Sequence, residues 1–163
     1  NSKKEVLLQK RSAKKIVGAT WWANAVCGNV WPTESYFDCA LRRLKVELGI
    51  TNVTLTPIYQ FTYKAYGNDS YGEHELDQVY VGQYDGAVVP NPEEVSDYAW
   101  VSFEKLQEAL VQVVYINEEQ SLLLSLEELK KQTAPVLVAI DGKEFLLAPW
   151  TVFMLKNAQL RLL

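Results

Sequence analysis

Residues 28–50 read GNVWPTESYFDCALRRLKVELGI, a polar loop followed by an amphipathic segment. From Tyr36 to Leu48 apolar residues recur at a helical period, while charged residues occupy the other sides. Gly49 follows as a C-cap residue, because glycine adopts the left-handed conformation that ends many helices. The stretch therefore predicts a loop, a helix over 36–48 and a second loop.

Strand-like and helical patterns alternate around this helix. Expected strands cover residues 5–9, 21–26, 54–66, 74–84, 98–101, 136–140 and 144–147, with a polar turn at 67–70. Further helices are expected from the cap Ser102 to about residue 110, from Ser125 to about 132, and from Pro149 onward. This order predicts a mixed α+β domain.

Length, charge and cysteine content restrict the class of protein. The 163 residues suit one domain with its own core, and a net charge of −4 argues against nucleic acid as a partner. No apolar run approaches the roughly 18 residues that a membrane span needs, so no membrane partner is expected. Cys27 and Cys39 are too few for a disulfide framework, which predicts free thiols and a cytoplasmic location.

The spacing within residues 28–50 resembles the Nudix box, a loop-helix-loop motif whose glutamates hold a divalent metal against a diphosphate. The matching residues are Gly28, Glu34, Arg42, Leu44, Glu47, Gly49 and Ile50. Arg43 and Val46 stand where the full hydrolase motif has glutamates. A motif that lacks these two glutamates argues against ordinary hydrolysis of a diphosphate bond.

Other segments make the resemblance more specific. Together they resemble type I isopentenyl diphosphate isomerase, a Nudix-fold enzyme with a degenerate Nudix box. They are residues 7–12, 24–28, 42–50, 72–77, 92–98 and 149–150. The resemblance implies a single Nudix-like domain over 1–163, with a mixed β-sheet sandwiched between helices. The stretch around 111–147 looks longer than its family counterpart and is expected to be an insertion.

By this resemblance the chain converts isopentenyl diphosphate into dimethylallyl diphosphate by adding one proton to the alkene and removing another. Cys27 corresponds to the catalytic cysteine beside the substrate carbon, and Glu75 to the second proton-transfer residue. Tyr63 corresponds to a tyrosine that hydrogen-bonds near this glutamate. Trp150 matches the tryptophan whose ring stabilises the cationic intermediate.

The resemblance also implies how a small prenyl diphosphate would be held. The candidates for binding the diphosphate are Arg11, Lys15 and Arg43. The expected ligands of Mg²⁺ are Glu47, Glu73 and Glu75. The last two are two positions apart, so both point from one face if their segment is extended, while His74 points away.

The family's three metal-binding histidines have no counterpart in this chain. Its single histidine is His74, and Asn29 stands where one family histidine would follow Gly28. The other two would come from a segment before residue 1. A second metal, Mn²⁺ or Zn²⁺, lacks imidazole ligands here. Two alternatives therefore stay open: a Nudix hydrolase of another diphosphate, and a catalytically silent relative that binds a diphosphate or a protein partner.

Overall fold

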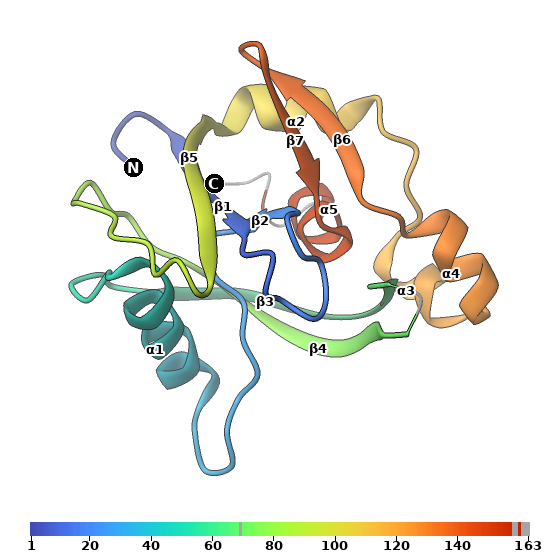
Figure 1. The fold of residues 1–163 in the computed structure, drawn as a ribbon, viewed down its shortest axis with the longest axis horizontal. Coiled ribbons are helices and arrows are strands. Elements are labelled where there is room, and N and C mark those ends of the chain that lie inside the picture. The colour runs from blue at the N-terminus through green and yellow to red at the C-terminus, as the bar shows by residue number, and fades with distance from the viewer. Residues whose placement is uncertain (69, 158–159, 161–163) are drawn as a thin grey trace.

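A computed structural model describes residues 1–68, 70–157 and 160, arranged around a five-stranded sheet (Figure 1). The strands are β1 (Glu5–Arg11), β2 (Trp22–Asn24), β3 (Thr56–Tyr66), β4 (Gly72–Val81), β5 (Val95–Ser102), β6 (Val136–Ile140) and β7 (Lys143–Leu147). The helices are α1 (Tyr36–Leu48), α2 (Phe103–Val111), α3 (Glu118–Leu122), α4 (Leu126–Gln132) and α5 (Pro149–Lys156).

The five-stranded sheet has the order β5-β1-β2-β7-β6. Its strand pairs are antiparallel except β2 and β7, which run parallel, so the sheet is mixed. The two remaining strands, β3 and β4, form a separate antiparallel ribbon. The α+β class predicted from the sequence is confirmed.

The helix predicted over 36–48 is present with those bounds. Ser35 caps it by accepting a hydrogen bond from the backbone N–H of Asp38, which satisfies one of the free donors at a helix start. Gly49 ends it at a φ of 68°. This left-handed conformation is unfavourable for residues that have a Cβ atom, but not for glycine. The loop before α1 is fixed by Arg42, whose guanidinium donates to Glu34 at 2.6 Å.

The second strand is shorter than the predicted 21–26. The backbone N–H of Asn24 donates to the Oγ1 of Thr151 in α5 rather than to a neighbouring strand. The chain therefore leaves the sheet after β2 and forms the loop that carries Cys27. The ribbon strands also differ from the expected 54–66 and 74–84, and residue 69 of the predicted turn lies outside the described residues.

The stretch around 111–147 forms ordered structure that packs against the rest of the chain. Helices α3 and α4 contact β3, and the hairpin of β6 and β7 completes one side of the five-stranded sheet. Asp141 and Gly142 both have positive φ angles, as the predicted two-residue hairpin requires. The short helix α3 was not expected, although Asn117 and Gln120 form a capping box at its start.

Two clusters of buried apolar side chains hold these elements together. The larger joins the inner faces of the sheet and the ribbon to α2 and α5. The smaller, around Leu7, Leu48 and Val95, packs α1 against β1 and β5. Within the described part of the chain, the helices are all too short or too polar to traverse a bilayer.

Candidate active site

Two adjoining cavities lie where β1, β4, α1 and α5 meet. The larger has a volume of about 660 Å³ and largely apolar walls, and the smaller has about 340 Å³ and charged walls. The residues that line both are Cys27, Gly28, Asn29, Arg43, Glu75, Asp77 and Trp150. An apolar chamber joined to a charged one suits a ligand with a hydrocarbon end and an anionic end.

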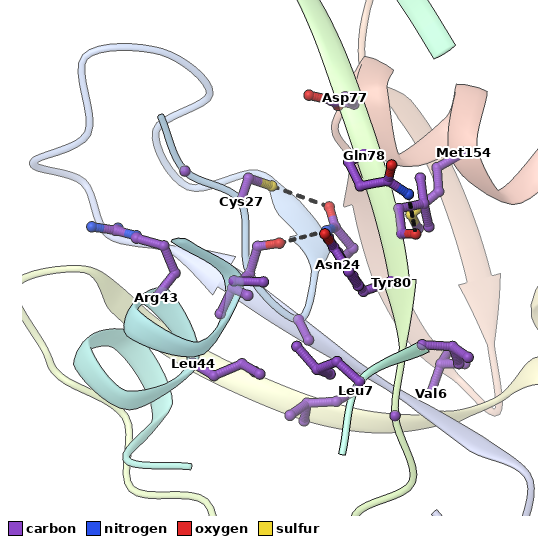
Figure 2. A pocket seen from close by; sticks show the side chains of 18 of the residues that line it. Val6, Leu7, Asn24, Cys27, Arg43, Leu44, Asp77, Gln78, Tyr80 and Met154 are labelled. Carbon is purple, nitrogen blue, oxygen red and sulfur yellow. Dashed lines mark hydrogen bonds between the residues drawn. The ribbon is translucent and has the colours of Figure 1, made fainter. Parts of the chain in front are cut away.

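Cys27 stands at this junction on the loop after β2. Its thiol donates a hydrogen bond to the Oδ1 of Asn24 at 3.2 Å, and the amide of Asn24 is itself anchored to the carbonyl of Val26 (Figure 2). Burial raises the pKa of the Cys27 thiol to about 12, and the charges of Asp77, Glu47 and Glu75 act in the same direction against that of Arg11. The sulfur therefore keeps its proton at neutral pH, which suits a proton donor.

This high pKa makes Cys27 a poor nucleophile. At pH 8 the thiolate fraction of a group with a pKa of about 12 is ~10³-fold below that of an unperturbed cysteine. We expect iodoacetamide to alkylate Cys27 in the folded chain about 10³-fold more slowly than in urea-unfolded chain, measured by mass spectrometry of the Cys27 peptide. Equal rates in the two states would contradict the raised pKa.

Three carboxylates lie on one face of β4. Glu73, Glu75 and Asp77 alternate with His74 and Leu76, and only the latter two are exposed. Burial, a hydrogen bond with Glu75 and its charge raise the pKa of Glu73 to about 8. Burial and Glu75 likewise raise the pKa of Asp77 to about 7. The negative charges on this face destabilise one another, so a cation would be stabilised there.

Tyr63 of β3 fixes the position of Glu75. The two residues are directly paired across the ribbon, and the tyrosine hydroxyl donates to the Oε2 of Glu75 at 3.2 Å. The ring is almost fully buried against Phe61 and Phe153. Burial, followed by the carboxylate charges of β4, raises the pKa of Tyr63 well above its usual value, so its hydroxyl stays a donor.

Trp150 opens α5 directly after Pro149 and lines both cavities. Its indole Nε1 is buried and has no hydrogen-bond partner among the described residues. The guanidinium of Arg11 lies 5.2 Å from the centre of the indole ring, which shows that this ring accepts a cation. Trp150 therefore offers a cation-stabilising ring and an unused N–H donor.

The predicted diphosphate-binding residues Arg11, Lys15 and Arg43 all line the smaller cavity. Arg11 donates through Nη2 to the carbonyl of Val17 at 2.8 Å. Lys15 forms an ion pair with Glu94, and Arg43 contacts the same carboxylate at 3.2 Å. The three cations thus border one cavity, and two of them, Lys15 and Arg43, share the carboxylate of Glu94.

The structure does not bring Glu47 together with Glu73 and Glu75 of β4 as one set of metal ligands. It is buried, its Oε1 accepts from Arg43 at 2.6 Å, and its Oε2 accepts from Gln9 at 2.7 Å. Within the described residues, no group of three His, Cys, Asp or Glu side chains has the geometry to hold a metal ion. Glu73 and Glu75 are oxygen donors that match Mg²⁺, which usually binds one or two carboxylates together with substrate phosphates.

The pairing of Arg43 with Glu47 leads to a prediction about stability. In Arg43→Met the buried carboxyl group of Glu47 loses the cation that pairs with it, so we expect the free energy of unfolding to fall by about 3 kcal/mol. Urea denaturation measures this change. The double variant Arg43→Met/Glu47→Met removes both charges and should recover most of the loss; a double variant less stable than the single one would contradict the ion-pair explanation.

Two residues of the site were not identified from the sequence. Asp77 continues the two-residue spacing of Glu73 and Glu75, and this period was the signal that could have identified it. Asn24 accepts from the Cys27 thiol and also from the hydroxyl of Thr151 at 3.3 Å. No sequence pattern indicated this role, because the contact depends on how the chain leaves β2.

The sequence of this chain is similar to one known protein family and to several curated proteins. A family model described as the NUDIX domain matches residues 1–117. Isopentenyl-diphosphate Delta-isomerase 1 of Aromatoleum aromaticum is 38% identical over 107 residues, covering 66% of this chain and 60% of the relative. The isopentenyl-diphosphate Delta-isomerase of Paenarthrobacter aurescens is 39% identical over 107 residues, covering 65% of this chain and 58% of the relative. The matched stretch thus spans about three fifths of these relatives.

Solved structures show the same architecture. A protein of Deinococcus radiodurans superposes with a TM-score of 0.56 at 19% identity, covering 76% of this chain and 74% of that one. The MutT protein of Methanosarcina mazei superposes with a TM-score of 0.51 at 29% identity, covering 66% of this chain and 74% of that one. At 19% identity, the similarity to the Deinococcus radiodurans protein concerns the fold alone.

Proposed function

Because the chain belongs to the Nudix family, we propose that it interconverts isopentenyl and dimethylallyl diphosphate. One observation carries the proposal: Cys27, Glu75 and Trp150 come from three distant segments and border the same two cavities. They supply a protonated thiol, a carboxyl group and a cation-binding ring. Moving a double bond through a carbocation requires these three groups and a dry chamber.

In the proposed reaction Cys27 gives its proton to the terminal methylene carbon of the substrate. The electron pair of the double bond forms the new C–H bond and leaves a tertiary cation, which the ring of Trp150 stabilises by about 2 kcal/mol or more in a desolvated site. Glu75 then removes a proton from the carbon next to the cation, and the double bond forms there. Tyr63, bound to the Oε2 of Glu75, keeps the carboxyl oriented.

The diphosphate would lie in the charged cavity. Arg11, Lys15 and Trp150 line this space, and the two cations would offset the charge of the diphosphate. Glu73 and Glu75 would hold Mg²⁺, which supplies positive charge that neutralises the diphosphate. For Glu47 to join them as a ligand, it would have to release Arg43.

A single incubation tests the proposal. The chain is mixed with isopentenyl diphosphate and Mg²⁺, the alkene protons are followed by NMR, and released phosphate is measured in parallel. We expect dimethylallyl diphosphate to appear without phosphate. In D₂O the product should carry deuterium at the new methyl group, because the alkene is protonated there.

Two other results would overturn the proposal. Phosphate release would indicate a Nudix hydrolase, against which Arg43 and Val46 in the motif already argue. Inertness toward both reactions would leave a diphosphate-binding relative. Isothermal titration with the same substrate then shows whether that pocket still binds its ligand.

A further inference from the structure

The hydroxyl of Thr151 bonds to a distant residue rather than to its own helix. Thr151 lies in the first turn of α5, directly after Trp150, and is fully buried. The residue four positions earlier, Leu147, belongs to β7, so the hydroxyl has no helix carbonyl to bind there. It donates instead to the Oδ1 of Asn24 at 3.3 Å and accepts from the backbone N–H of Asn24 at 3.1 Å. The two residues are 127 positions apart in the chain.

Asn24 continues this contact to the thiol. Its Oδ1 accepts from the Sγ of Cys27 at 3.2 Å as well as from Thr151 (Figure 2). Its Nδ2 donates to the carbonyl of Val26 at 2.7 Å, which determines which end of the amide carries the oxygen. Because an amide oxygen has two lone pairs, this oxygen is fully used. A single amide group therefore connects the thiol of Cys27 to α5.

The loop that carries Cys27 needs such a connection. Residues 25–35, all of them described, form neither helix nor strand, so the loop has no regular backbone pairing to fix the cysteine. The helix to which it is connected is itself fixed, because the N–H of Ala148 donates to the carbonyl of Trp22 in β2 at 2.8 Å. The first turn of α5 can therefore act as a rigid support for the loop.

We propose that Asn24 and Thr151 form a positioning bridge, which holds the sulfur of Cys27 at the junction of the two cavities and in fixed relation to the ring of Trp150. The hydrogen bond to the amide oxygen selects one of the staggered rotamers open to a cysteine side chain. The proton can then reach the alkene by rotation about the Cβ–Sγ bond, which moves no heavy atom. The consequence for catalysis rests on the proposed function, whereas the bridge itself does not.

Infrared spectroscopy tests the bridge without any reaction. The chain has two cysteines, so in a Cys39→Ala background the S–H stretching band belongs to Cys27 alone. Thr151→Val removes the hydroxyl but keeps the shape, and should broaden this band and shift it to higher frequency, because the hydrogen bond of the thiol is weakened. Thr151→Ser keeps the hydroxyl and should restore the band. Asn24→Ala removes the acceptor and should give the larger shift, while its backbone bond to Thr151 is retained.

Thr133→Val is the matched control. Thr133 is also fully buried, and its hydroxyl accepts from the N–H of Tyr66 at 2.8 Å and donates to the carbonyl of Leu129 at 2.7 Å. It lines neither cavity. Its replacement thus removes a comparable pair of hydrogen bonds outside the site. We expect a lower thermal midpoint in both valine variants, but an unchanged S–H band and an unchanged kcat in Thr133→Val.

The NMR assay of isomerisation adds the kinetic measurement. Because a misplacement of 1 Å can cost about 10²-fold in rate, we expect Thr151→Val to lower kcat by at least about tenfold, with KM within about threefold of the parent chain and Thr151→Ser close to the parent. In an active parent chain, an unchanged kcat in Thr151→Val, or an equal fall in Thr133→Val, would overturn the positioning role. A parent chain inert toward isopentenyl diphosphate would refute the proposed function instead, and the infrared band would then decide alone: a band that neither Thr151→Val nor Asn24→Ala shifts would overturn the bridge.

Discussion

Cys27→Ala is expected to lower kcat for isomerisation by about 10³-fold, within the range that a positioned proton-transfer group contributes. The reason is specific: the thiol is the group at the cavity junction that holds a proton far above neutral pH, with a pKa of about 12. A methyl group cannot protonate an alkene. The NMR assay for dimethylallyl diphosphate measures the loss.

Cys39 provides the matched control. It is a buried free thiol on α1 whose sulfur donates to the carbonyl of Gly28 at 3.4 Å, and it lines only the larger cavity. Cys39→Ala should keep kcat within about threefold of the parent chain, because it removes no proton-transfer group. If Cys27→Ala retained comparable activity while circular dichroism and the thermal midpoint were unchanged, the thiol would have no part in the reaction.

The helix at 36–48 shows what local sequence determines. Its apolar period, the cap Ser35 and the terminal Gly49 act within a few residues, so the pattern predicted both ends. The hairpin around Asp141 and Gly142 was predictable for the same reason. The family resemblance, now supported by a matching family model and isomerase relatives, depended on similarly short segments.

The features that the sequence did not predict depend on contacts between residues far apart in the chain. The early end of β2 depends on Thr151, more than a hundred positions away from Asn24. The pairing of Glu47 with Gln9 depends on two elements meeting across the core. A buried carboxylate requires a partner, but the chain pattern does not say whether that partner is a metal or an arginine. The metal role of Glu47 therefore stays a prediction.

Glu75→Gln is the second large effect, an expected loss of about 10³-fold in kcat, or about 4 kcal/mol of transition-state stabilisation. The amide has nearly the same shape and can still accept the hydrogen bond from Tyr63, so the fold should be retained. It cannot, however, remove a proton from the cationic intermediate. The NMR assay measures this rate, with His74→Gln as a control on the exposed face of the same strand.

A second measurement tests whether Glu75 acts electrostatically on Glu73 and Asp77. The charge of Glu75 contributes to the raised pKa values of Glu73, about 8, and of Asp77, about 7. Removing that charge should lower both pKa values, because a neighbouring negative charge disfavours a second one. Carboxyl ¹³C NMR titration follows the shift. Lost activity with both pKa values unchanged would show that Glu75 does not carry the charge assigned to it, whereas lower pKa values with full activity would remove it from the proton transfer.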